Sequence, residues 1–176
     1  QRVFGAENLS TLLCQHDFVR ALYKLTKYAE AEELCRRLIS SQTRVFGPEG
    51  KDTLLARRLF CSILFDQGRR KEAEAEHRQV LPLYQRVFGP EHRETLICRS
   101  LVIGMQALQG SNAAAEAQCR EHLPVITRVL GAEDENTIQL RMVFIRILSA
   151  QMKMDETAEE LREMVVLHQR VHGPAH

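Results

Sequence analysis

The sequence predicts an all-α fold, a right-handed α-solenoid of stacked antiparallel helix pairs. A loop motif that reads Arg-Val-Phe-Gly-Pro-Glu at 44–49 returns every 42 residues along the 176-residue chain. Each of the first four copies precedes two stretches whose apolar residues recur at helical spacing. A fixed period of this length is typical of solenoids, whose repeats bury their apolar faces against their neighbours. The motif copies begin at Arg2, Arg44, Arg86, Arg128 and Arg170.

The period also predicts the domain organisation. We expect residues 1–176 to form a single repeat domain that is a fragment of a longer array, because a complete array usually carries atypical capping repeats. The repeats cover residues 2–43, 44–85, 86–127 and 128–169, and residues 170–176 open a further one.

The repeat at 44–85 shows the two helices expected in each copy. Gly47 belongs to a turn, and the first helix is expected to begin near position 52, where Thr53 can cap free amides or brace the loop. Gly68 suits the left-handed exit of that helix. A second helix then follows from about Lys71, so two helices of roughly 15 and 18 residues form an antiparallel hairpin.

Composition excludes several classes of function. The net charge is +1, whereas nucleic-acid-binding modules usually carry a clear basic excess, so no nucleic-acid partner is expected. No apolar run approaches 18 residues, so no membrane insertion is expected.

The five cysteines are predicted to be small core-lining residues of an intracellular, cytoplasmic protein. They form no C-x-x-C pair, and Cys35 and Cys119 share one repeat position, as Cys14 and Cys98 share another. This pattern favours free thiols in a reducing compartment over a disulfide or metal framework.

Sequence motifs give no sign of catalysis. The seven histidines include no H-E-x-x-H pattern and no zinc-finger spacing. The glycine-rich phosphate loops and the nucleophile elbow are also missing. We therefore predict a protein that is not an enzyme, with no catalytic residue, no cofactor and no metal site.

The repeat resembles the tetratricopeptide repeat, in its two helices, its turn glycine and the second-helix alanine at Ala31, Ala73 and Ala115. The 42-residue period, the Gly-Pro-Glu-His loop and the Thr-Leu that opens the first helix are similar to the long form of kinesin light chains and of nephrocystin-like and NB-ARC-type sensor proteins. The resemblance covers the whole chain. It implies a scaffold for protein–protein interactions.

The sequence departs from that family at the peptide-binding positions of the first helix. An asparagine pair on the first helix clamps the peptide backbone in kinesin light chains, and it is replaced here in every repeat. The resemblance therefore does not carry that family's cargo binding over to this chain. The four positions read His16-Asp17, Arg58-Leu59, Ser100-Leu101 and Met142-Val143.

The family's groove positions imply a binding surface on the concave face of the first helices. In the first two repeats they are basic with an aromatic residue, which suits an extended peptide with acidic groups. In the last two they are small or apolar, which suits a helix laid in a groove. The alternative is that they are ordinary solvated and packing residues. The candidates are His16, Arg20, Tyr23, Lys24, Arg58, Ser62, Phe65, Asp66, Ser100, Met142 and Arg146.

Arginines recur in register on both helices of the repeat. The simplest cause is a repeated contact with Glu32, Glu74, Glu116 or the loop glutamates, and phosphate or RNA binding along the superhelix is the disfavoured alternative. The positions are Arg36, Arg78, Arg120 and Arg162 on the second helix, and Arg57, Arg99 and Arg141 on the first.

Three functions remain open. The leading hypothesis is a non-enzymatic scaffold whose preorganised concave groove binds a peptide or helix of a partner protein, for example one with acidic groups. A second is a structural or peripheral subunit of a large multiprotein assembly, docked by its outer or edge surfaces. A third is the sensor segment of a nucleotide-dependent switch protein, with the ATPase outside this sequence.

Overall fold

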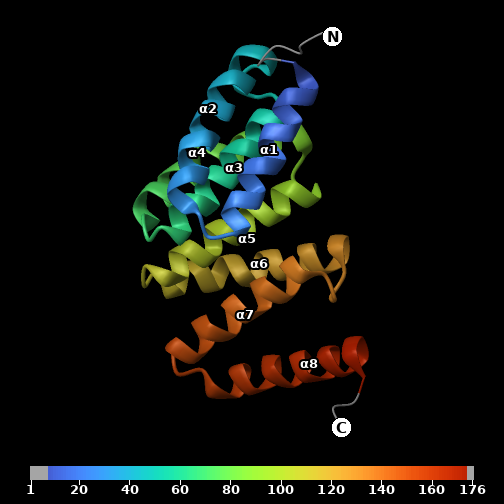
Figure 1. Cartoon of the computed structure of the whole chain (residues 1–176). Helices are drawn as coiled ribbons and strands as arrows, with labels where there is room; N and C mark the ends of the chain where they lie inside the picture. Colours follow the sequence, from blue (N-terminus) through green and yellow to red (C-terminus); the bar gives the residue numbers. More distant parts are fainter. Residues whose placement is uncertain (1–7, 174–176) are drawn as a thin grey trace. The chain divides into compact units, whose positions relative to one another are not determined.

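The computed structural model describes residues 8–173, and this part of the chain forms eight α-helices (Figure 1). Each repeat supplies a first helix of 16 residues and a second of 19, close to the predicted lengths. The all-α prediction is confirmed. The helices are α1 (Leu9–Lys24), α2 (Tyr28–Phe46), α3 (Lys51–Asp66), α4 (Arg70–Phe88), α5 (Arg93–Leu108), α6 (Asn112–Leu130), α7 (Glu135–Ala150) and α8 (Met154–His172).

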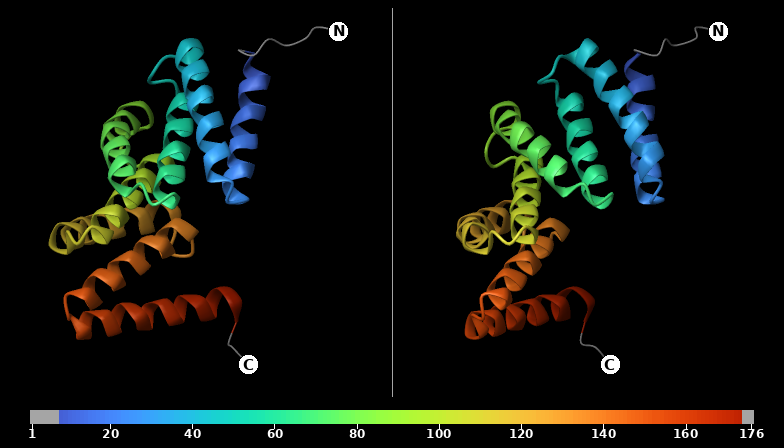
Figure 2. Two further views of the ribbon diagram at one scale, coloured as in Figure 1. Left: turned by 60° about the vertical axis from the view of Figure 1, so that its left-hand side comes forward. Right: turned by 90° about the vertical axis from the view of Figure 1, so that its left-hand side faces the viewer.

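The helices form two compact units, which divide between Gly89 and Pro90. In the N-terminal unit, α2 packs against both α1 and α3, and α3 packs against α4 (Figure 2). In the C-terminal unit, α6 packs against both α5 and α7, and α8 packs on α7. Within each unit, therefore, the second helix of one repeat contacts the first helix of the next.

The turn inside each helix pair adopts a left-handed conformation. Gly68 and Gly110 have φ of +80° and +84°, as predicted for a glycine at a helix exit. The other two pairs place Thr26 and Met152 at the same point, each with φ of +59°. The four turns thus share one geometry, although two of them carry a side chain that disfavours it.

The loop between repeats is braced by side chains. Thr53 donates a hydrogen bond from Oγ1 to the carbonyl of Gly47 at 3.0 Å, so it braces the loop and does not cap the helix. The side chains of Asn8, His92 and Asp134 accept a backbone N–H two residues on, which caps α1, α5 and α7. Helix α3 begins at Lys51, one residue before the predicted start.

The cysteines are free thiols, and four of them are buried as predicted: Cys35, Cys61, Cys98 and Cys119. Burial raises the pKa of the Cys35 thiol to about 12, which leaves it unreactive. The prediction is wrong for Cys14, which is exposed because no helix of the described residues covers that side of α1. Within residues 8–173, none of the helices combines the length and the apolar character that crossing a membrane requires.

Gly104 gives a test of helix packing in the C-terminal unit. It lies inside α5, and a Cβ atom built there would approach Val143 Cγ2 at 3.7 Å, an ordinary contact. Because glycine in a helix interior costs about 0.5–1 kcal/mol relative to alanine, we expect Gly104→Ala to raise the free energy of unfolding by about that amount. Gly110→Ala, at positive φ, should lower it. Urea unfolding followed by circular dichroism measures both, and destabilisation by Gly104→Ala would contradict this packing.

Candidate functional site

The first-helix face of the N-terminal unit brings two candidate residues together. The Tyr23 hydroxyl on α1 donates to Asp66 Oδ2 on α3 at 2.6 Å. Burial, together with this hydrogen bond, raises the pKa of Tyr23 far above its usual range. The hydroxyl is therefore engaged within the unit, and the half-buried ring is the part that a partner could contact.

The charge on this face is lower than the sequence suggested. His16 is half-buried, and burial lowers its pKa against the opposing effect of Asp17, so the imidazole is neutral at pH 7. Arg20 pairs with Asp17 at 3.1 Å. Arg58 is half-buried near His16, and Lys24 is exposed in the last turn of α1. The face thus mixes cations with carboxylates.

Two further candidates on α3 make contacts inside the unit. The Ser62 hydroxyl donates to the Arg58 carbonyl of its own helix at 3.4 Å. The Arg70 guanidinium lies 6.0 Å from the centre of the Phe65 ring, so a cation already covers part of this aromatic group.

Helix α7 of the C-terminal unit carries a shallow groove of about 720 Å³. Met142 has half of its surface exposed there (51%), and Arg146, also a candidate, is exposed in the same groove. Most of the lining is apolar. The lining residues are Ile138, Gln139, Met142, Val143, Ile145, Arg146, Ser149 and Ala150.

Ser100, in contrast, takes part in the packing of its own helix pair. Its hydroxyl lies 3.1 Å from the Leu96 carbonyl and 3.2 Å from His122 Nε2, and that nitrogen lies 3.0 Å from the same carbonyl. His122 and His77 are both fully buried, as expected for their positions on the second helices. Among residues 8–173, no group of three or more potential metal ligands comes together.

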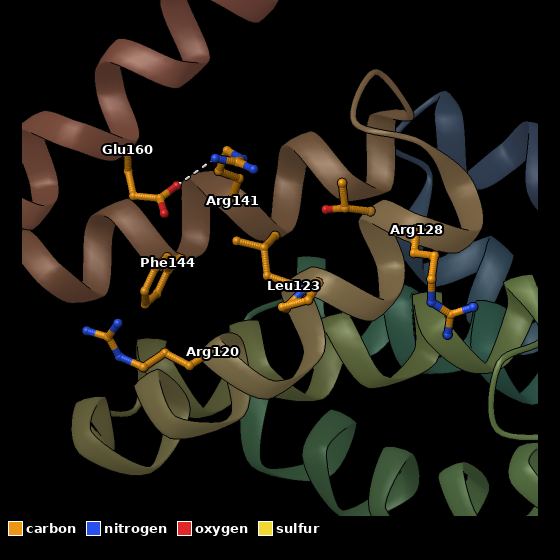
Figure 3. Close-up of a pocket in the computed structure, with 8 residues that line it drawn as sticks. Arg120, Leu123, Arg128, Arg141, Phe144 and Glu160 are labelled. Atoms are coloured by element: carbon orange, nitrogen blue, oxygen red, sulfur yellow. Dashed lines mark hydrogen bonds and ion pairs between the residues drawn. The ribbon is translucent and has the colours of Figure 1, made fainter.

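A second hollow, of about 520 Å³, lies on the C-terminal unit among α6, α7 and α8 (Figure 3). Three arginines line it together with Leu123 and Phe144, and such a lining is typical of a site that binds anions. Each arginine is paired with a glutamate, however, so the positive charge of the hollow is neutralised. The pairs are Arg120 with Glu116 at 2.8 Å, Arg128 with Glu91 at 2.5 Å and Arg141 with Glu160 at 2.9 Å.

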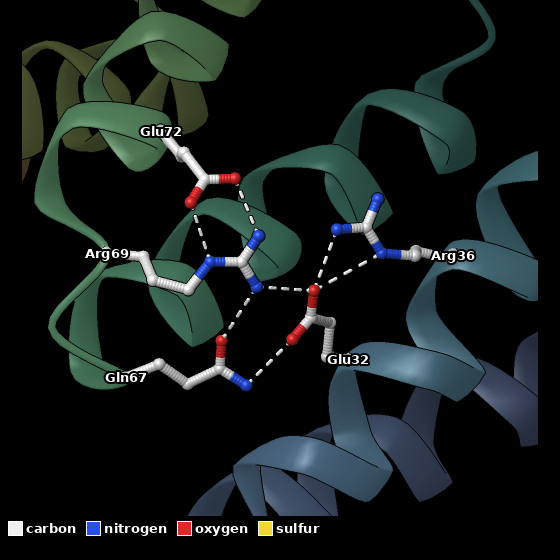
Figure 4. A network of polar contacts seen from close by, with 5 residues as sticks. All are labelled: Glu32, Arg36, Gln67, Arg69 and Glu72. Carbon is white, nitrogen blue, oxygen red and sulfur yellow. Dashed lines mark hydrogen bonds and ion pairs between the residues drawn. The ribbon is translucent and has the colours of Figure 1, made fainter.

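Glu32 is the centre of a network that joins two repeats (Figure 4). It accepts hydrogen bonds from Arg36 at 2.7 Å, from Arg69 at 2.7 Å and from Gln67 at 2.9 Å. Burial alone would raise the pKa of Glu32, but these bonds outweigh it and lower the pKa to about 2. Glu116 repeats the arrangement with Arg120 and with Lys153 at 2.6 Å.

The arginine register therefore has the simple cause that the sequence indicated. Arg36, Arg78 and Arg120 pair with the predicted glutamates, although each pair lies within one helix. Arg120 also pairs with Glu156 of the next repeat. The contacts that Glu32 and Glu116 receive from the next repeat come from Arg69 and Lys153, which sequence reasoning missed. Their shared repeat position was the signal that could have revealed them.

Comparison with known proteins shows which repeat fold this chain resembles. A tetratricopeptide repeat model matches residues 11–50 and 62–94. A Podospora anserina protein designated a kinesin light chain, with nearly identical tetratricopeptide-like repeats, superposes with a TM-score of 0.73 at 18% identity over 98% of this chain and 82% of that one. The chain is similar to tetratricopeptide repeat arrays, including one designated a kinesin light chain. Its predicted α-solenoid fold is thereby confirmed.

Two further structures resemble this chain. A variant of the same Podospora anserina protein, with a methionine in place of a glutamine, superposes with a TM-score of 0.76 at 18% identity, with the same coverage. BtubC (BKLC) from P. vanneervenii superposes with a TM-score of 0.80 at 9% identity over 94% of this chain and 66% of that one. A comparison with curated protein sequences finds no significant match. The fold is that of a protein–protein interaction scaffold, a class that is typically non-enzymatic.

Proposed function

We propose that this array binds a segment of a partner protein on the exposed face of its first helices, with α7 as the main contact. The observation that carries the proposal is the groove on α7, where Met142 is half exposed among other apolar side chains. An exposed methionine side chain is a frequent contact residue of binding surfaces that accept varied partners.

The shape and chemistry of the groove favour an amphipathic helix as the bound segment. The lining runs from Ile138 to Ala150 along a single helix, so a second helix can lie beside it with its apolar side chains on Met142 and Val143. Arg146 is exposed in the same groove and suits a carboxylate on the polar side of that segment.

The N-terminal unit is proposed to add charge-selective contacts. Arg20 and Lys24 are exposed on α1, and Arg20 pairs with Asp17, while Asp66 on α3 accepts the hydrogen bond from Tyr23. Such exposed pairs contribute little to affinity, but they discriminate between partners and are screened by salt. We place the protein inside the cell, since the buried free thiols fit a reducing compartment.

A phage-displayed random peptide library, selected on the intact chain, tests this function. We expect the selected peptides to be amphipathic, and Met142→Glu to weaken their binding at least about tenfold, because it places a charge in the apolar groove. Fluorescence anisotropy of labelled peptides gives the dissociation constants.

Val166→Glu is the matched control, because Val166 is exposed to a similar extent (46%) but lies on α8, outside the groove. It should leave the affinity unchanged. Peptides that bind the Met142→Glu variant as tightly as the parent chain would contradict the proposed site.

A further inference from the structure

His122 occupies a core position of the C-terminal unit that the other repeats fill with an apolar side chain. It lies on α6 and is fully buried. Leu38, Val80 and Met164 hold the same repeat position, and all three are buried as well. An imidazole in place of a hydrocarbon brings two ring nitrogens into the core, where a polar atom is normally hydrogen-bonded.

One of the two nitrogens has a partner on the neighbouring helix. Nε2 lies 3.0 Å from the Leu96 carbonyl of α5 and 3.2 Å from the Ser100 hydroxyl, which itself lies 3.1 Å from that carbonyl. A carbonyl oxygen only accepts hydrogen bonds, so Nε2 carries the proton that joins the two helices. The neutral ring therefore has its free lone pair on Nδ1.

Nδ1 is the atom that a second proton would have to bind, and its surroundings do not suit one. Among the described residues of the chain, this nitrogen is buried without a hydrogen-bond partner. A bare lone pair is tolerated there at a modest cost. A protonated ring, however, would place a charged N–H at the same point with no acceptor. The packing of α6 on α5 therefore favours the neutral ring.

The charges near the ring do not offset this preference. Burial lowers the pKa of His122 and outweighs the hydrogen bond to Leu96, which favours the proton. Arg99 on α5 lowers the pKa further, while Glu121 on α6 opposes Arg99 and pairs with it at 3.0 Å.

The charged side chains of α7, which also packs on α6, are either paired or exposed. Arg141 pairs with Glu160 of α8 at 2.9 Å, and Glu135 and Arg146 are exposed. The residues that α7 adds to the core of the unit are apolar, namely Leu140, Phe144, Ile147 and Leu148.

We propose that His122 makes the α5–α6 helix pair an acid-sensitive element, which opens when the ring takes up a second proton and leaves its place beside Leu96. The opened pair takes up the proton first, near the ordinary imidazole pKa of 6.5. The contact thus holds fully above pH 6.5 and weakens as the pH falls below it. Because Ser100 shares the Leu96 carbonyl, the opening also frees a side chain of the first-helix face. This device belongs to the fold of the unit and does not depend on the segment that the array binds.

Hydrogen exchange of the intact chain, measured by mass spectrometry from pH 7.5 to pH 5, tests the proposal. The exchange rates of the parent chain are divided by those of His122→Leu at each pH, which removes the pH dependence of the exchange chemistry. Leucine suits the position, since Leu38 holds it in the first repeat. In α5 and α6 this ratio should be constant above pH 6.5. It should rise by up to about tenfold for each pH unit below that value.

His122→Gln is the matched control, because glutamine keeps an N–H donor for the Leu96 carbonyl but cannot take up a proton. The same ratio for this variant should not change with pH. His77→Leu, which removes the buried histidine of the N-terminal unit, should keep the acid response of α5 and α6. A parent ratio that stays constant down to pH 5 would overturn the proposal. So would an acid response that persists in His122→Gln or disappears in His77→Leu.

Discussion

Replacing Phe144 by alanine is expected to lower the free energy of unfolding of the C-terminal unit by about 3–5 kcal/mol, since it removes a buried ring and leaves a cavity. Phe144 is 4% exposed and belongs to the core cluster of that unit, with Leu140, Ile147 and Leu148. A loss of this size is a large part of the stability of an ordinary domain. Hydrogen exchange measured by mass spectrometry locates the loss of stability. The protection of backbone amides against exchange should fall in α5–α8.

Phe60→Ala is the matched control in the N-terminal unit, because it removes the same ring at the same repeat position. In a repeat array, stability is approximately a sum over repeats and their neighbour contacts, so a defect acts locally. Protection should then fall mainly in α1–α4. Equal loss over all the helices in both variants would contradict the division into two compact units.

Acidification is expected to weaken the N-terminal unit through His77. Burial, aided by Arg58, lowers the pKa of His77 from 6.5 to about 4. The unfolded chain therefore takes up the proton first, and the stability present above pH 6.5 is lost as the pH falls towards 4. The lowered pKa of His77 corresponds to about 3 kcal/mol in the free energy of unfolding. Urea unfolding at pH 7 and at pH 4 gives the difference.

His77→Leu separates this contribution from the other titrating groups. The variant keeps an apolar side chain at a buried position, and Leu161 holds the same place in the fourth repeat. The difference in stability between pH 7 and pH 4 should shrink by about 3 kcal/mol relative to the parent chain. An undiminished acid effect in His77→Leu would contradict a neutral buried imidazole.

The sequence predicted the helices well because each signal is local to one repeat. Apolar spacing defines a helix, and Gly68 marks its end, so both could be read without knowledge of the partner helices. Contacts between repeats could not be read in this way. Tyr23 and Asp66 are 43 residues apart, and only the packing of α1 against α3 shows that they meet.

The candidate face was harder to predict, since a repeat position does not fix where a side chain points. Ser100 holds the position of His16 and Met142, but its hydroxyl lies against His122 in the neighbouring helix. His16 was expected to add positive charge, and burial keeps it neutral. Cys14 was expected in the core because Cys98 is buried, but no described helix covers that side of α1.

Site-specific photo-crosslinking tests most directly whether the first-helix face binds the partner. A photoreactive amino acid is placed at Met142 in the α7 groove in one variant and at Val166 on α8 in another. Peptides selected on the intact chain are then irradiated with each. Crosslinks at position 142, with few or none at position 166, are the expected result. Crosslinks at position 166, with none at position 142, would contradict binding on the first-helix face.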